Sequence, residues 1–133
     1  MLGTPTLSVE KLIHPELSYI ICGILYRVRQ KLGDGYREKH IQRAVAAALL
    51  KSGLVFREQV MVLMKFEDQI IGKYFLDFLI DNKVVLELKI GERLAKKDYN
   101  QIKNYLKQAG LKLGLLARFG KNGVTVHRVL RPL

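Results

Sequence analysis

The stretch YFLDFLIDNKVVLELKI, residues 74–90, decides the fold of this chain. Its apolar residues form two runs separated by Asp-Asn-Lys at residues 81–83, which predicts two antiparallel strands joined by a short turn. Runs that are apolar on both faces are typical of strands inside a sheet covered by helices. We therefore expect strands over residues 70–80 and 84–90, the first of them central in the sheet.

The remaining elements follow from the spacing of apolar residues on either side of this hairpin. In chain order we expect a helix from Pro15 to residue 32, a helix over 36–52, strands over 54–66, 70–80 and 84–90, a helix over 97–109, and strands over 111–118 and 123–129. A helix joins the third strand to the fourth, so these two should run parallel. The sequence predicts one α/β domain over residues 1–133, a three-layer α/β/α fold with a mixed central sheet.

Three polar residues interrupt the apolar strands: Asp77, Glu87 and Lys89. With a three-residue turn Asp77 lies directly opposite Glu87, and Lys89 shares the face of Glu87; a two-residue turn would put the carboxylates on opposite faces. Two like charges about 5 Å apart repel by about 3 kcal/mol at an effective dielectric near 20. A structural ion-pair cluster is one explanation, and a divalent cation such as Mg²⁺ bound between the carboxylates is the other.

A fourth acid, Glu38, lies on the apolar stripe of the helix expected over residues 36–52, three residues before Ile41. It also falls in the first turn of that helix, where a carboxylate interacts favourably with the helix dipole. Glu38 is therefore either a further ligand of the same cation or a residue that only stabilises the helix.

Positive charge is concentrated at the end of the chain. The 23 Lys and Arg against 12 Asp and Glu give a net charge of +11, and residues 89–133 alone hold 11 basic and two acidic side chains. A concentrated positive field suits a polyanion, most commonly nucleic acid. The predicted contacts to nucleic acid are Arg93, Lys96, Lys97, Lys103 and Lys107. A basic surface without a partner is the alternative.

Composition excludes other classes. The longest apolar run, Ala44–Leu50, is far shorter than the about 20 residues of a membrane span. A single cysteine, Cys22, rules out an internal disulfide and a multi-cysteine zinc site. The first residues lack the pattern of a secretory signal, so we expect a cytoplasmic protein. The large apolar residues of the first helix make a homodimer plausible.

The spacing of Asp77 and Glu87-x-Lys89 on a hairpin resembles the PD-(D/E)XK nuclease superfamily, with Leu76 where the motif has proline. Gly35-x-x-Glu38, the Leu-Glu-Leu-Lys strand, and Gln101 with Tyr105 are similar to the GxxExxY group of that superfamily. The resemblance extends over about residues 17–131, and Ile41 stands where the group has its signature tyrosine.

The resemblance implies a restriction-endonuclease-like domain with an αβββαβ core, an N-terminal helix and a C-terminal strand. It implies a metal-dependent nuclease that hydrolyses phosphodiester bonds, in DNA rather than RNA, with Mg²⁺ or Mn²⁺ as cofactor. The implied metal ligands are Asp77, Glu87, the Leu88 carbonyl and Glu38. Lys89 would orient the attacking water and stabilise the phosphate, and Gln101 and Tyr105 would flank the site. A non-catalytic nucleic-acid-binding module on the same fold remains the alternative, because Ile41 and Leu76 depart from the motif.

Overall fold

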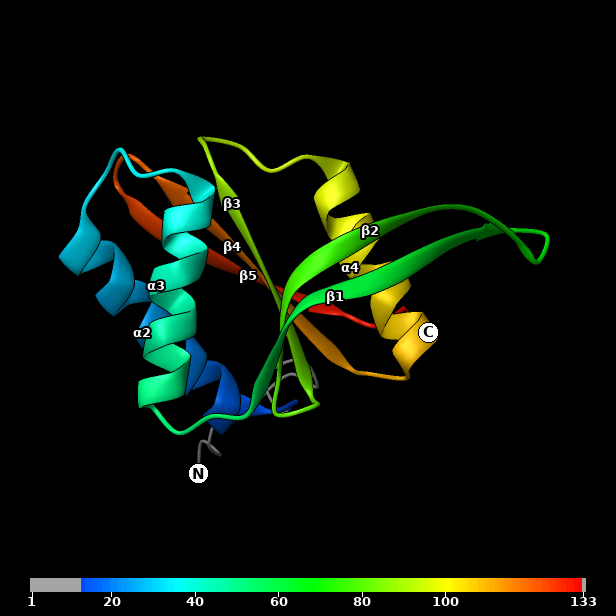
Figure 1. Ribbon diagram of the computed structural model, residues 1–133, viewed down its shortest axis with the longest axis horizontal. Coiled ribbons are helices and arrows are strands. Elements are labelled where there is room, and N and C mark those ends of the chain that lie inside the picture. The colour runs from blue at the N-terminus through cyan, green and yellow to red at the C-terminus, as the bar shows by residue number, and fades with distance from the viewer. Residues whose placement is uncertain (1–12, 133) are drawn as a thin grey trace, which may run out of the picture.

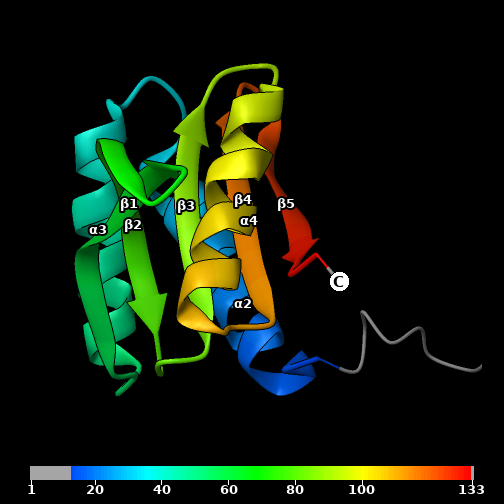
Figure 2. The same cartoon turned by 90° about the vertical axis from the view of Figure 1, so that its right-hand side faces the viewer.

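The computed structural model describes residues 13–132, in which five strands form one mixed sheet between two layers of helices. The elements in chain order are α2 (Pro15–Leu32), α3 (Glu38–Lys51), β1 (Phe56–Phe66), β2 (Gln69–Ile80), β3 (Val84–Ile90), α4 (Lys96–Ala109), β4 (Leu113–Gly120) and β5 (Gly123–Leu130). The helices α2 and α3 cover one face of the sheet and α4 covers the other (Figures 1 and 2). The predicted three-layer arrangement is confirmed.

The strands lie in the order β1-β2-β3-β4-β5, with β3 and β4 parallel and the other neighbours antiparallel. The expected parallel pair is therefore present. The expectation that residues 70–80 form the central strand is wrong, because β3 occupies the centre. Only the second half of β2 is buried, and the apolar side chains of its first half are largely exposed.

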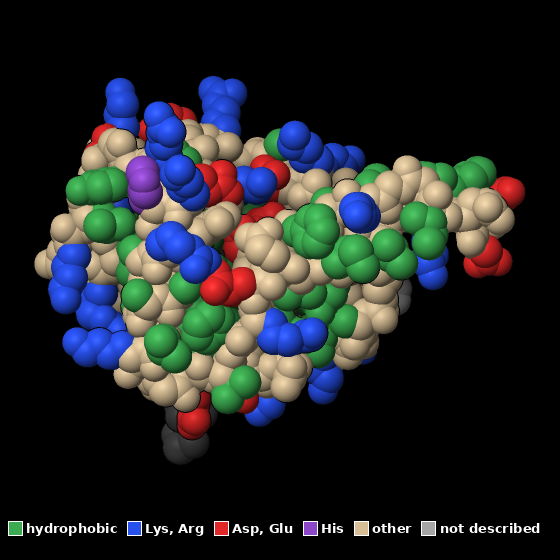
Figure 3. Space-filling view, viewed as in Figure 1, with side chains coloured by type: hydrophobic (Ala, Val, Ile, Leu, Met, Phe, Trp, Pro, Cys, Tyr) green, Lys and Arg blue, Asp and Glu red, His purple; other side chains and the backbone are tan. Residues whose placement is uncertain are grey.

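That first half of β2 pairs with the second half of β1 in an arm that projects from the body of the molecule (Figure 1). The arm begins where Gln59 of β1, opposite Asp77 of β2, adopts a left-handed backbone with φ 52°. Its exposed apolar residues, which cover much of the arm in Figure 3, are Met61, Met64, Phe66, Ile70, Ile71 and Phe75. Apolar residues in a strand thus do not always report burial in the sheet.

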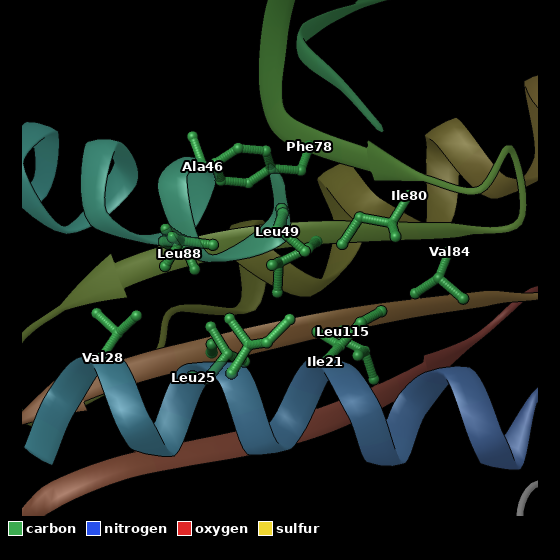
Figure 4. Close-up of a cluster of buried hydrophobic side chains, with 14 of the residues drawn as sticks. Ile21, Leu25, Val28, Ala46, Leu49, Phe78, Ile80, Val84, Leu88 and Leu115 are labelled. Carbon is green, nitrogen blue, oxygen red and sulfur yellow. The ribbon is translucent and has the colours of Figure 1, made fainter. Parts of the chain in front are cut away.

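The main core lies between the sheet and the pair α2 and α3 (Figure 4). Ile21, Leu25 and Val28 of α2 and Leu49 of α3 meet the apolar side chains of β2, β3 and β4 there. A second cluster packs α4 against the opposite face. Within residues 13–132, no helix has both the length and the apolar character that a bilayer crossing requires.

The close approach of α4 to β4 depends on Gly114. A Cβ atom on Gly114 would overlap Cγ2 of Ile102 and would lie 2.9 Å from Cγ1 of Val85. Both of these neighbours are fully buried, so they have little room to move.

We expect Gly114→Ala to lower the free energy of unfolding by about 1–3 kcal/mol, the usual cost of overpacking a core. Gly23→Ala in α2 is the matched control, because its nearest neighbour is the Arg27 side chain at 3.5 Å. That change should raise the free energy of unfolding by about 1 kcal/mol, through higher helix propensity. Urea denaturation of both variants would measure this, and an unchanged midpoint for Gly114→Ala would show that α4 yields without cost.

Candidate active site

The candidate site lies where β2 separates from β3. Regular pairing of the two strands runs from the turn only as far as Phe78 and Leu86. At the next residues, Asp77 and Leu88, the backbone N–H groups bond to carboxylate side chains in place of backbone carbonyls. The N–H of Asp77 donates to Oε1 of Glu87 at 3.0 Å, and the N–H of Leu88 donates to Oδ2 of Asp77 at 2.7 Å. The two carboxyl groups therefore occupy the gap between the strands.

The turn at residues 81–83 has the odd length that the sequence interpretation required, and the pairing of Ile80 with Val84 fixes the register. Asp77 thus lies opposite Glu87, as predicted. Asp77 is 5% exposed and Glu87 is 4% exposed. Burial, together with the hydrogen bond and the charge of Asp77, raises the pKa of Glu87 to about 9. Without a cation between them, the two carboxyl groups cannot both hold a negative charge cheaply.

Lys89 lies beside this pair. Its ammonium nitrogen is 4.0 Å from Oε2 of Glu87 and 3.8 Å from Oδ1 of Asp98. Asp98 belongs to the first turn of α4 and is 6% exposed, and its Oδ2 accepts the N–H of Ala95. The carboxylate of Asp98 therefore caps α4 and faces the lysine at the same time.

Helix α3 brings two more polar groups to the site. Nε2 of Gln42 donates to Oδ1 of Asp77 at 2.5 Å. Glu38 lies one turn earlier on the same face and is partly buried. Burial and the charge of Asp77 raise the pKa of Glu38, while Lys89 opposes that rise. Glu38 is thus close enough to the pair to interact with it electrostatically.

Gln42 and Asp98 were missed by the sequence interpretation, although each carried a signal. Gln42 follows Glu38 by four residues, the spacing of one helix face. Asp98 is one of two acidic residues among the eleven basic ones of residues 89–133. An isolated acid in a basic segment, placed in the first turn of a helix, indicates a local partner.

The two predicted site residues of α4, Gln101 and Tyr105, lie in different surroundings. The main-chain oxygen of Gln101 accepts the Tyr74 hydroxyl at 2.7 Å, so Gln101 lies beside the base of the arm. Tyr105 is 8% exposed and belongs to the apolar cluster under α4. Tyr105 shares this cluster with Val60 and Leu76, and the expectation that both residues flank the site stays a prediction.

The predicted nucleic-acid contacts also fall into groups. Helical spacing places Lys96, Lys103 and Lys107 on one stripe of α4, and Lys103 lines a pocket with the end of β5. Lys97 falls on a second stripe, about 100° around the helix, with Gln108, whose amide donates to the Leu63 carbonyl of the arm. Arg93 is exposed in the loop between β3 and α4. Figure 3 shows lysine and arginine side chains around the acidic groups near the base of the arm.

Ile41, which replaces the signature tyrosine, is 6% exposed and packs in the core with Leu88 and Phe119. A residue at this position contacts the interior of the domain. The departure from the signature therefore lies at a core position of the domain.

The donor set fits a small divalent cation. Asp77 and Glu87 present carboxylate oxygens, and the backbone of Leu88 faces the same gap through its N–H, so its carbonyl lies on that side as well. Among residues 13–132, no three or more His, Cys, Asp or Glu side chains cluster as metal ligands. Mg²⁺ does not need such a cluster, because it usually keeps several waters and binds one or two carboxylates.

We expect the free energy of unfolding in EDTA to fall as the pH rises from about 4.5 to about 9. Glu87 has a usual pKa of 4.5 in the unfolded chain and about 9 in the folded chain, so across this window the folded chain holds a proton that the unfolded chain has lost. Urea denaturation at pH 5, 7 and 9 would measure the slope. In Glu87→Gln the slope should be smaller; an equal slope in both proteins would contradict the assignment.

Comparison with known proteins agrees with this geometry. The family model described as the PD-(D/E)XK nuclease superfamily matches residues 15–129. Among solved structures, one titled crystal structure of SSO0001 is similar, with 15% identity, coverage of 89% of this chain and 79% of that one, and a TM-score of 0.47. An alkaline exonuclease (LHK-Exo) from Laribacter hongkongensis has 12% identity, covers 96% of this chain and 78% of its own, and has a TM-score of 0.50.

At such low identities a structural likeness concerns the fold alone, and no curated protein matches the chain. The three layers and the mixed sheet form a restriction-endonuclease-like fold. The family model covers most of the chain, including both strands that carry Asp77 and Glu87. The chain therefore belongs to the PD-(D/E)XK nuclease superfamily.

Proposed function

We propose that this protein is a metal-dependent nuclease that hydrolyses phosphodiester bonds, in DNA in preference to RNA. The observation that carries the proposal is the buried pair of Asp77 and Glu87 with the Lys89 ammonium 4.0 Å from Glu87. We also assign the chain to the GxxExxY group, on the sequence pattern of Gly35 and Glu38 and the position of Glu38 beside the pair.

In this proposal Asp77, Glu87 and the Leu88 carbonyl hold Mg²⁺ or Mn²⁺, with Glu38 as an accessory acid. The ion, when bound, lowers the pKa of a water molecule and stabilises charge on the phosphate. It also offsets the burial and the charge of Asp77, which raise the pKa of Glu87. The gap between β2 and β3 would thus be suited to a cation rather than to a proton.

The remaining residues act on the substrate or on one another. Lys89 presents an ammonium group to the non-bridging oxygens of the scissile phosphate, where negative charge grows in the transition state. Asp98 holds that ammonium from the side of α4, and Gln42 orients the Asp77 carboxylate through a 2.5 Å hydrogen bond. The N-termini of α3 and α4 point toward this end of β3, and their dipoles favour the bound phosphate (Figure 1).

We expect the wild-type protein to cut DNA with Mg²⁺ or Mn²⁺ and to lose cutting in EDTA. Glu87→Gln should reduce the cleavage rate about 100-fold or more, because it removes a ligand of the cation. Labelled single-stranded, duplex and branched DNA, and RNA of the same sequence, would show the products on denaturing gels and would identify the preferred substrate.

The matched control is Glu67→Gln, which removes the same charge from the exposed tip of the arm. It should cut at the wild-type rate. Absence of cutting by the wild-type protein on every substrate, with binding intact, would sink the nuclease and favour a non-catalytic binding module.

We expect Asp98→Asn to lower kcat about tenfold, the usual effect of removing a residue that orients a catalytic group. KM should stay near the wild-type value, since Asp98 contacts Lys89 at 3.8 Å and does not contact the substrate in this proposal. Glu92→Gln removes the other acid of the basic segment and is the control. A lower melting temperature in Asp98→Asn with wild-type kcat would indicate only a helix-capping role.

A further inference from the structure

A basic pocket lies between α4 and the end of β5, on the flank of α4 away from the arm. It is open to solvent, has a volume of about 470 Å³, and is lined by Tyr99 and Lys103 of α4 and by residues 128–132. The ring of Tyr99 meets His127 of β5 edge-on, with 6.1 Å between centroids and 80° between planes. The tyrosine ring is thus held against the sheet as one wall of the pocket.

The charged side chains that line this pocket are all positive. Lys103 and Arg131 line it, and Lys96 and Lys107 continue the same stripe of α4 on either side of Lys103. The sole acid of α4 is Asp98, which is buried and faces Lys89, and β5 has none. No carboxylate of α4 or β5 therefore neutralises this flank.

We propose that the groove between α4 and β5 binds the nucleic-acid strand as it continues away from the active site, with the Tyr99 pocket at its centre. The proposal rests on the proposed function and identifies where a long substrate lies. Lys103 and Arg131 would neutralise phosphates, and Tyr99 would stack on a base. Lys96 is the first residue of α4 and lies across the helix from Asp98, so a strand that leaves the site would pass around the N-terminus of α4 to reach the stripe.

The shape of the charged stripe favours a polymer over a small anion. From Lys96 to Lys107 the helix rises roughly 16 Å at 1.5 Å per residue. That length matches about five phosphates of one strand at 3.4 Å each. A free nucleotide would touch only the pocket, whereas a strand that leaves the active site can use every cation of the stripe.

The test compares two doubly neutralised proteins that lose the same charge. Lys103→Gln with Arg131→Gln alters the groove. Arg27→Gln with Lys31→Gln alters two residues of α2, which lie on the opposite side of the sheet and line a different groove with α3. Binding of labelled single-stranded DNA of 6 and 24 nucleotides would be followed by fluorescence anisotropy in EDTA, with thermal melting to show that both proteins fold.

We expect the groove variant to bind the 24-mer about tenfold more weakly at 100 mM salt, and the 6-mer more weakly by a smaller factor, because its five phosphates cannot cover both the active site and the groove. The slope of log K against log salt concentration should become shallower by about 1.4 in this variant. Two phosphate contacts are lost, and each contact to a single strand contributes about 0.7 to that slope. The α2 variant should bind both oligonucleotides like the wild type. Equal weakening in the two variants, or wild-type binding by the groove variant, would overturn the proposal.

Substitutions of Tyr99 give a second test, because they change base stacking and leave the charge of the groove unchanged. Tyr99→Ala should weaken binding of the 24-mer about tenfold, and Tyr99→Phe should restore it, because stacking needs the ring and not the hydroxyl. Wild-type binding by Tyr99→Ala would count against the pocket. The two proposals fail in different ways. If the wild-type protein binds DNA through the groove but never cuts it, only the proposed nuclease activity is refuted. If the groove variant cuts with the wild-type dependence on substrate length, only the proposed groove is refuted.

Discussion

The rest of the structure depends on the placement of Asp77 opposite Glu87 in neighbouring strands. Two buried carboxyl groups lie opposite each other in neighbouring strands and hydrogen-bond to backbone N–H groups in place of the next ladder partners. Ionised carboxylates are almost never buried without partners. The strands part at this point, Gln59 takes a left-handed conformation opposite it, and the arm leaves the sheet there.

The surrounding layers serve this arrangement from both faces of the sheet. From one face α3 contributes Glu38 and Gln42, and from the other α4 contributes Asp98. Gly114 leaves room for Ile102 of α4 to pack on the sheet, and the first turn of the same helix places Asp98 3.8 Å from Lys89. The packing of α4 in the second apolar cluster and the geometry of the site therefore depend on each other.

Charge and apolar surface are distributed around the site in different directions. Lys103 of one α4 stripe lies beside the end of β5, Gln108 of the other stripe contacts the arm, and the arm itself exposes apolar residues. A substrate that follows the positive charge would leave the site along α4 and β5. The apolar arm, with the acidic Glu67 and Asp68 at its tip, is less suited to a polyanion.

Much of the fold was predictable from the sequence, because strand and helix periodicities are local and the turn at residues 81–83 alone sets the register that opposes Asp77 and Glu87. The central place of β3, the burial of Tyr105 and the exposure of the arm were not predictable, since apolar residues attract burial without specifying which partner buries them. Gln42 and Asp98 entered the site only through the tertiary structure. They lie 35 and 9 residues from Asp77 and Lys89, on helices from opposite faces, and only packing of both helices on one sheet brings them together.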